Sequence, residues 1–444
     1  METIVQIAQL LLALSILVGI HEGGHMLTAK MFGMRVEKFF IGFPPTLFSF
    51  TKGETEYGLG AIPLGGFVKI SGMIDESLDK EQMSQEPQPW EFRSKPAWQR
   101  LIVMLGGIIV NVIAGVIAMI SLTYIDGDQF YSSDLIKENG LEVMQYGAEF
   151  GFEEGDIVLD INGEDYERLE DLSSPDLFLR DGGYYTVLRN GEQIRIDVPD
   201  GVLDQMSQDK AFRANFLWPR AGFVVRYLND PEYIENSNAH RAGILENDKI
   251  VSVDSTDVEY WADLVSTLAT KAGQVVTIGV ERSGEYFNYD VAVKADSTIG
   301  VVRGSLLQTE RKDYSFGEAA SVGTAKAFNL VILNAKALGK MFTGGVSARS
   351  LMGPIGIVEL YPKTWDWSQF LYTTAFISMI LAFMNLLPIP ALDGGHVMFL
   401  LFEMISGRAP SDKFLEGAQK VGMIILLGLM VFVFGNDILK LFGI

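Results

Sequence analysis

IVQIAQLLLALSILVGI (residues 4–20), followed directly by HEGGH (residues 21–25), is the stretch of this 444-residue chain that decides its fold. The first run is almost uninterrupted Leu, Ile, Val and Ala, and its apolar pattern continues to about Phe32. A helix of about 20 apolar residues crosses roughly 30 Å of hydrocarbon, so the run predicts a first membrane span. A cleaved signal peptide is the competing interpretation. However, no basic stretch precedes the run, and His21-Glu22 stands where a small-residue cleavage site is expected.

Hydrophobic residues make up 48% of the chain, and three further apolar runs predict membrane spans. These runs cover residues 101–122, residues 370–405, which prolines interrupt, and residues 421–434, which form a short span. Basic residues gather after the first span, before the second, and between the last two: Lys30, Arg35, Lys38, Arg93, Lys95, Arg100, Arg408, Lys413 and Lys420. Cytosolic loops carry an excess of Lys and Arg. These loops are therefore predicted to be cytosolic, with both termini on the opposite side, which in a Gram-negative bacterium is the periplasm.

The middle of the chain has a different composition from its ends. Residues 126–315 carry 37 acidic and 17 basic side chains, which accounts for nearly all of the net charge of -21. This composition predicts an acidic, soluble unit inserted between spans, on the same side of the membrane as the termini. An acidic surface repels phosphate backbones, so nucleic acid is not expected as a partner.

Between the first two spans, residues 57–73 read YGLGAIPLGGFVKISGM. The segment contains two short β-prone runs separated by Pro63-Leu-Gly-Gly66, which predicts a hairpin or a looped pair of strands. Its apolarity and its place between two spans indicate a membrane-associated β-hairpin loop. Such a loop is tolerated at membrane depth only if it is buried in protein or lines a wet cavity.

The soluble insert contains an internal repeat at a spacing of about 91 residues. GFEEGDIVLDING (residues 151–163) and AGILENDKIVSVD (residues 242–254) both read as an apolar turn, an acidic turn and a strand. Both passages resemble PDZ domains, although the second has Asn247-Asp248 where the first has Gly-Asp. We therefore expect two PDZ-like α+β domains, residues 126–212 and 213–306, of ordinary domain size.

A connecting segment, residues 307–364, follows the insert. Within it, residues 316–342 place apolar positions at helical spacing together with Lys326, Lys336 and Lys340. The pattern predicts an amphipathic helix that either lies on the membrane surface or packs against the PDZ-like pair.

HEGGH matches the H-E-x-x-H pattern, which places two imidazoles one turn apart on one helical face with a glutamate beside them. Ionisable groups inside a span are costly and usually mark function. A pair of satisfied interior histidines is the alternative, but it leaves Glu22 without a role. Gly23 and Gly24 each cost a helix about 1 kcal/mol relative to Ala. Close approach of another segment explains such residues.

A catalytic zinc site needs a third protein ligand and an open position. The chain has no cysteine and only four histidines, and NLLPIPALDGGH (residues 385–396) brings Asp393 and His396 into the interrupted third span. Prolines in this segment free backbone groups, and glycines permit close contact. An aspartate in hydrocarbon needs a partner, which is either a metal ion or a neighbouring amide. Spacing alone does not choose between Asp393 and His396.

The motifs HEGGH, IPLGGFVKI (residues 62–70) and NLLPIPALDGG (residues 385–395), together with the PDZ-like pair, resemble the site-2 protease family of intramembrane zinc metalloproteases. The resemblance covers essentially the whole chain in order. It implies that His21, His25 and Asp393 bind Zn²⁺ and that Glu22 is the catalytic base. It also implies a bacterial inner-membrane protein that cuts transmembrane substrates such as anti-sigma factors, after another protease has removed their periplasmic portion.

The resulting architecture is a multi-span α-helical membrane protein with four transmembrane helices, divided into membrane segments 1–125 and 365–444 around the insert. We expect a substrate helix to open near the metal and lie extended along residues 57–73, with Asn385 holding its backbone. Asn385 has a simpler alternative role, which is to satisfy carbonyls freed by the prolines. The alternative function is a non-catalytic membrane scaffold that binds extracytoplasmic peptides, but such a protein is expected to lose Glu22 or a ligand. The oligomeric state is not predicted.

Overall fold

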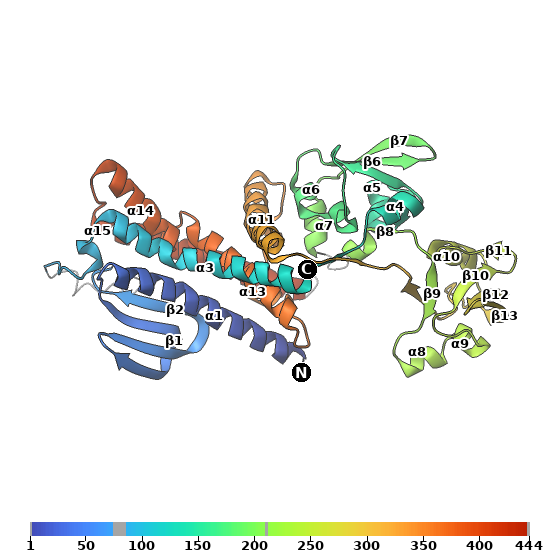
Figure 1. Ribbon diagram of the computed structural model, residues 1–444, viewed down its shortest axis with the longest axis horizontal. Coiled ribbons are helices and arrows are strands. Elements are labelled where there is room, and N and C mark those ends of the chain that lie inside the picture. Colours follow the sequence, from blue (N-terminus) through green and yellow to red (C-terminus); the bar gives the residue numbers. More distant parts are fainter. Residues whose placement is uncertain (1, 74–85, 209–211, 442–444) are drawn as a thin grey trace. The chain divides into compact units, whose positions relative to one another are not determined.

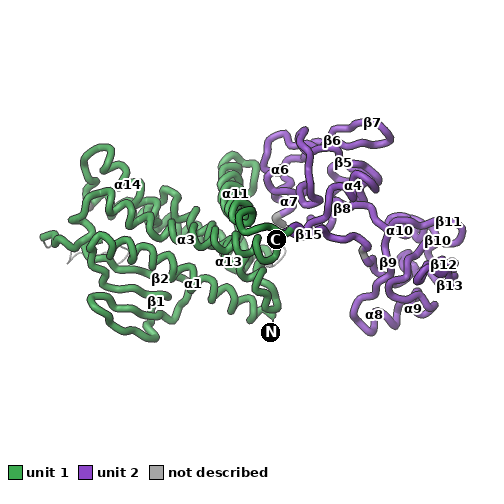
Figure 2. The backbone as a smooth tube through the Cα atoms, in the orientation of Figure 1, with its two compact units in different colours: residues 1–127, 313–444 green, residues 128–312 purple. Residues whose placement is uncertain are grey.

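The computed structural model describes residues 2–73, 86–208 and 212–441 (Figure 1). The chain forms two compact units, which Figure 2 distinguishes by colour. Residues 1–127 and 313–444 form the membrane unit, and residues 128–312 form the soluble unit. The soluble unit is thus an insertion in the sequence of the membrane unit.

Within the described residues, four helices are long and apolar enough to cross a membrane. They are α1 (Glu2–Met31), α3 (Ala97–Asp126), α13 (Trp367–Leu386) and α15 (Asp412–Leu441). The expected number of spans is confirmed. The expectation of a short fourth span is wrong, because α15 continues well beyond residues 421–434 at both ends.

The third apolar run is broken, as its prolines predict. α13 ends at Leu386, and a new helix, α14 (Asp393–Ser406), begins after an irregular segment. Proline lacks the backbone N–H that continues a helix, which accounts for the break. Ala391 in this segment has a φ of 89°, a left-handed conformation that is strained for alanine. α14 has 14 residues, fewer than the roughly 20 that a span requires.

Helices α1, α3 and α13 pack side by side (Figure 1). Where α1 crosses α3, a Cβ atom on Gly24 would overlap the backbone of Gly106, and one on Gly106 would lie 2.7 Å from the carbonyl oxygen of Gly24. Only glycine at both positions allows the two backbones to approach this closely. The expected close approach is thus confirmed for Gly24. It does not explain Gly23, whose Cβ would have no neighbour within 4 Å among the atoms described.

A two-stranded sheet of β1 (Val36–Lys52) and β2 (Thr55–Ile70) lies along α1. The expectation that residues 57–73 form a strand pair by themselves is wrong, because their partner is the preceding segment, residues 36–52. Both strands bend. Residues 39–41 pair with residues 57–59 and also with residues 66–68, while residues 46–52 pair with residues 55–60. Residues 66–70 therefore form an edge of the sheet.

Helix α11 (Phe316–Thr343) also belongs to the membrane unit. Ser315 caps its first turn, and its buried face consists of Ala319, Gly323 and Ala327. A Cβ on Gly323 would lie 2.6 Å from the Cα of Ile120, so this face packs closely on α3. α11 also contacts α13. A short helix, α12 (Pro354–Glu359), precedes α13.

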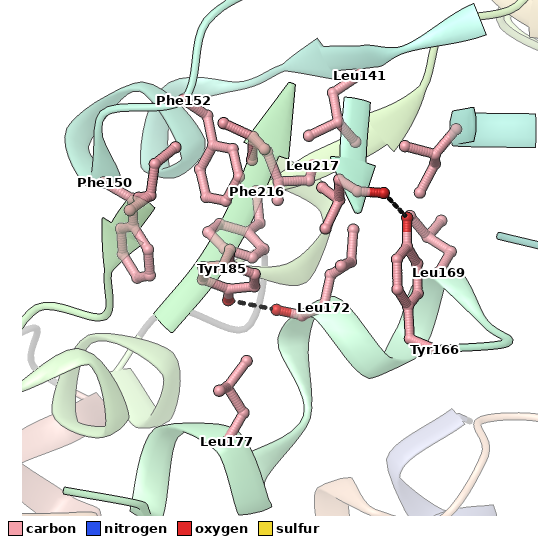
Figure 3. Close-up of a cluster of buried hydrophobic side chains, with 14 of the residues drawn as sticks. Leu141, Phe150, Phe152, Tyr166, Leu169, Leu172, Leu177, Tyr185, Phe216 and Leu217 are labelled. Atoms are coloured by element: carbon pink, nitrogen blue, oxygen red, sulfur yellow. Dashed lines mark hydrogen bonds between the residues drawn. The ribbon is translucent and has the colours of Figure 1, made fainter. Parts of the chain in front are cut away.

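The first lobe of the soluble unit has a three-stranded sheet in the order β5 (Ile157–Ile161), β6 (Tyr184–Arg189), β7 (Glu192–Asp197). A second sheet pairs β4 (Leu141–Val143) with β8 (Leu217–Pro219). Short helices cover them: α4 (Asp134–Asn139), α5 (Gln145–Phe150), α6 (Pro175–Leu179) and α7 (Val202–Gln208). The core is rich in aromatic rings, and the buried Tyr185 hydroxyl donates to the carbonyl of Leu172 (Figure 3).

The second lobe contains a four-stranded sheet in the order β11 (Thr256–Asp257), β10 (Lys249–Val253), β12 (Val275–Arg282), β13 (Glu285–Ala292). Strand β9 (Phe223–Arg226) pairs with β14 (Val302–Ser305). The helices are α8 (Pro231–Glu235), α9 (Asn238–Ala242) and α10 (Trp261–Ala269). The insert begins with β3 (Asp128–Phe130) and ends with β15 (Glu310–Lys312), and these strands pair with each other.

The repeat seen in the sequence recurs as one ion pair in each lobe. Arg189 binds the buried Asp156 through two nitrogens, and Arg282 binds the buried Asp248 in the same way. Each arginine also donates to a backbone carbonyl in the turn at the start of its repeat. The missing glycine of the second copy is also explained, because Asn247 has a φ of 69° and asparagine tolerates this left-handed conformation.

Candidate metal centre

Three side chains from two distant segments meet at one point in the membrane unit. His21 and His25 lie one turn apart on α1, and Asp393 is the first residue of α14. Their Nε2 and Oδ2 atoms form a nearly equilateral triangle. The distances are 3.3 Å between the two nitrogens, 3.2 Å from His21 to Asp393 and 3.3 Å from His25 to Asp393.

This triangle fits a tetrahedral zinc ion. Zinc–nitrogen and zinc–oxygen bonds of about 2.0–2.2 Å place tetrahedral ligands roughly 3.3–3.5 Å apart. The Oδ2 atom of Asp393 is also buried, and it accepts no hydrogen bond from any residue that the structure describes. A buried carboxylate oxygen without a donor is costly, and a cation at the centre of the triangle would satisfy it.

The far side of the His25 ring is held by the backbone of α3. His25 Nδ1 lies 2.8 Å from the carbonyl oxygen of Val103, an atom that can only accept. Nδ1 therefore carries the proton, and Nε2 keeps the lone pair that a metal requires. His25 is buried, and a Cβ on Gly107 would lie 2.5 Å from its Nε2 atom. The space beside the ring therefore requires glycine at position 107.

Asn111 performs the same task for His21. Its side-chain amide lies 3.3 Å from His21 Nδ1, with the nitrogen placed toward the ring, while its buried Oδ1 atom has no partner among the described residues. Amide oxygen and nitrogen atoms are interchangeable in shape, so the hydrogen-bond network decides their assignment. Rotating the amide by half a turn lets Oδ1 accept from Nδ1–H. That arrangement satisfies Oδ1 and leaves His21 Nε2 free for a metal.

Glu22 borders the same site without joining the triangle. It lines a cavity of about 450 Å³ together with the three triangle residues and the apolar side chains of Phe43, Phe67, Val68, Ile70, Met73 and Met104. Its carboxylate accepts a hydrogen bond from the backbone N–H of Val68 on the edge segment 66–70. The backbone N–H of Val68 therefore points away from strand β1 and toward the cavity.

The structure separates the remaining sequence candidates. Asn385, near the end of α13, lies close to the triangle, with Nδ2 3.4 Å from His21 Nε2. His396 lies one turn beyond Asp393 but lines a different cavity. His240 is in the soluble unit, where its ring contacts Tyr227. Within the described parts of the chain, His21, His25 and Asp393 are the one group of His and acidic residues placed to share a metal ion.

Sequence reasoning missed Val103, Gly107 and Asn111. A backbone carbonyl and a glycine leave no distinctive signal in an apolar run. Asn111 does leave one, because it is a polar residue in the middle of the second apolar run, and such residues usually face the interior of a helical bundle.

Comparison with known proteins identifies the class. Residues 9–429 match peptidase family M50, so nearly the whole chain is covered. The chain therefore belongs to this family, the site-2 protease family that its motifs resemble. It is a zinc-dependent metalloprotease embedded in a membrane.

Individual relatives are similar in sequence to this chain over almost their full length. "Regulator of sigma E protease" of Haemophilus influenzae is 28% identical, over 97% of this chain and 98% of the relative. "Regulator of sigma-E protease RseP" of Escherichia coli is 27% identical, with 98% of each chain aligned. A protein of Pasteurella multocida named as a zinc metalloprotease is 29% identical over the same shares.

We expect Asp393→Ala to bind much less zinc than the unmodified protein, because the triangle loses one of its three candidate ligand atoms. His396→Ala is the matched control and should keep its zinc, because His396 faces another cavity. The measurement is zinc content per chain after dialysis of the purified proteins. Full occupancy in Asp393→Ala together with an empty His396→Ala would reassign the third ligand.

Asn111→Leu should weaken zinc binding by about 10- to 100-fold, the usual effect of removing a group that orients a ligating histidine. Asn111→Asp should bind zinc nearly as well as the natural protein, because it keeps an oxygen that accepts from His21. Competition with a chelator of known affinity gives both values. Equal weakening in the two variants would show that the oxygen is not what matters.

Proposed function

We propose that the protein is an intramembrane zinc endopeptidase that cleaves transmembrane segments of membrane proteins. His21, His25 and Asp393 are its metal ligands, and Glu22 is its catalytic base. The triangle of ligand atoms next to the Glu22 carboxylate, on the wall of an apolar cavity, carries this proposal. The arrangement supplies three protein ligands and leaves one side facing the cavity, which distinguishes catalytic from structural zinc sites.

The residues divide the chemical work between them. Zinc bound here would supply Lewis acidity, which polarises a peptide carbonyl and acidifies water. Glu22 takes the proton from the attacking water and delivers it to the leaving amine. The hydrogen bond from Val68 holds the Glu22 carboxylate toward the cavity. Val103 and Asn111 keep the protons of both histidines on the side away from the metal.

A substrate helix must open before it can be cut, because its peptide groups are closed in internal hydrogen bonds. The edge segment 66–70 lines the cavity and offers outward backbone groups for an added strand. Asn385 is placed to hold the substrate backbone. Its amide lies beside His21, and no hydrogen bond from it to a carbonyl of the broken span is found among the described residues. This favours a role in substrate binding over the satisfaction of freed carbonyls.

The biological setting follows from the relatives. Because they are named as regulators of sigma-E, the substrates proposed for this chain are membrane proteins of the anti-sigma factor type, cut after a first periplasmic cleavage. The lobes are proposed to be PDZ-like domains that exclude substrates with bulky periplasmic portions. The expected boundary between residues 212 and 213 lies later in the chain, because β8 pairs with β4 of the first lobe. The basic short loops support a bacterial inner-membrane orientation with these lobes and both termini in the periplasm. A scaffold without catalysis would have no need for Glu22 and the three ligands to converge.

Glu22→Gln should retain zinc and lose turnover by at least about 10²–10⁴-fold, because the amide cannot accept the proton that a general base removes. Cleavage of a transmembrane peptide and zinc content are measured on the same preparation. A Glu22→Gln protein that cuts at the natural rate would eliminate Glu22 as the base, whatever its metal content.

Val68→Pro should slow cleavage by about tenfold, because proline removes an N–H that points into the cavity rather than into the sheet. Val68→Ala is the control, since it keeps the N–H and changes only the side chain. Peptides with Gly or Pro near the cut should be cleaved faster than poly-Leu peptides, because these residues destabilise a helix by about 1–3 kcal/mol. Equal cleavage of both peptide types, with full activity of Val68→Pro and Asn385→Ala, would contradict extended binding.

A further inference from the structure

A second cavity adjoins the metal centre in the membrane unit. It has a volume of about 300 Å³ and lies among α3, α14, the start of α15 and residues 72–73. Its walls are mostly apolar, with aromatic and aliphatic side chains from Met73, Phe92, Phe399, Leu400 and Leu415. The volume is within the range of small-ligand pockets and accommodates a large apolar side chain.

Two polar side chains face this apolar space without a partner. Gln419 on α15 is only 7% exposed, and neither it nor His396 forms a hydrogen bond with any residue that the structure describes. The charged pair in the wall, Arg100 and Glu403, is by contrast mutually satisfied. The amide of Gln419 lines the cavity and is available to a polar group that enters it.

The second cavity and the metal cavity are neighbours along strand β2 and the turn that follows it. Residues 66–68 and Ile70 line the metal cavity, Gly72 lines the second cavity, and Met73 lines both. The segment before α14 also contributes to both, because Pro390 and Ala391 border the second cavity and Asp393 borders the first. A polypeptide that adds to the edge segment 66–70 is therefore directed from the metal toward the second cavity.

We propose that the second cavity is a substrate subsite for a large apolar residue several positions from the cut bond, with Gln419 binding the substrate backbone there. This inference rests on the proposed protease function. From Val68, beside Glu22, to Gly72 is four residues, a reach of at most about 13 Å at roughly 3.3 Å per residue, because β2 ends at Ile70 and a turn closed by the hydrogen bond from Met73 N–H to the carbonyl of Ile70 follows it. The side chain that fills the cavity therefore belongs to a residue roughly three or four positions from the cut, on one side only.

The walls define the chemistry of that residue. Leu, Phe or Met fits a lining of rings and aliphatic chains. A Lys or Glu side chain would be buried without a free counter-ion, because the charged residues of the wall are already paired, Arg100 with Glu403 and Arg93 with Glu91. The amide of Gln419 can both donate and accept, which matches one peptide unit of an extended chain. The rate of cleavage should therefore depend on the identity of a substrate residue several positions from the cut bond.

The test compares cleavage by the full-length protein in detergent of one long transmembrane peptide and two truncated peptides. Each truncated peptide ends two residues from the cut, one on each side. Ala409→Trp places a bulky ring at the cavity wall, and Ala335→Trp, on the exposed face of α11, is the control. Ala409→Trp should lower kcat/KM for the long peptide by at least tenfold and leave one truncated peptide unaffected. Ala335→Trp should change neither.

A second variant tests the amide itself. Gln419→Leu keeps the size of the side chain and should lower kcat/KM three- to tenfold for peptides that reach the cavity. In the unmodified protein, a peptide with Lys at the position that fills the cavity should be cleaved more slowly than the original peptide. In Ala409→Trp, where the cavity is blocked, the two peptides should be cleaved at equal rates. The subsite would be overturned if Ala409→Trp cleaved the long peptide with an unchanged kcat/KM. It would also be overturned if Ala409→Trp kept its zinc but lost kcat/KM equally for all three peptides. If the natural, zinc-loaded protein cut none of the peptides, the protease function itself would be refuted.

Discussion

The close crossing of α1 and α3 is the contact on which the metal centre depends. Lipid supplies no hydrophobic force to join two helices, so the association relies on close packing and hydrogen bonds. Glycine at positions 24 and 106 lets the two backbones touch, and this contact brings a carbonyl of α3 within hydrogen-bond distance of His25. About two turns further along α3, Asn111 reaches His21. The two histidine rings are therefore oriented by a helix that contributes no ligand.

Asp393, the proposed third ligand, reaches the site because a span is broken. A carboxylate inside a membrane is costly unless it is paired. In a continuous helix through residues 385–396, the backbone groups that now form a loop would instead be used in hydrogen bonds within the helix. Starting α14 at Asp393 puts the carboxylate at a helix N-terminus, where the backbone dipole favours negative charge. The glycines that follow have room only for hydrogen, since the preceding loop folds against them. The same break creates the boundary between the two cavities.

Much of this arrangement could be predicted from the sequence, because hydrophobic runs and short motifs are local signals. Four spans, the break at the prolines and the residues His21, His25 and Asp393 all came from such signals, although choosing Asp393 over His396 required the family resemblance. The pairing of residues 36–52 with β2 was missed because strand partners are set by contacts distant in sequence. The extent of α15 was underestimated because its ends are polar while its middle is apolar. The second cavity arises where several segments meet, and no single segment of the sequence reveals it.

The pairing of strands β3 and β15 bears on how the inserted lobes could be gained or lost in evolution. They bring the first and last residues of the insert together, so the chain leaves α3 and returns to α11 through neighbouring positions. An insertion whose ends are adjacent places few constraints on its host. Duplication of one lobe, or its loss, would leave the spacing of the flanking helices unchanged. The two copies of the Asp–Arg pair are what a tandem duplication within such a permissive position would leave behind.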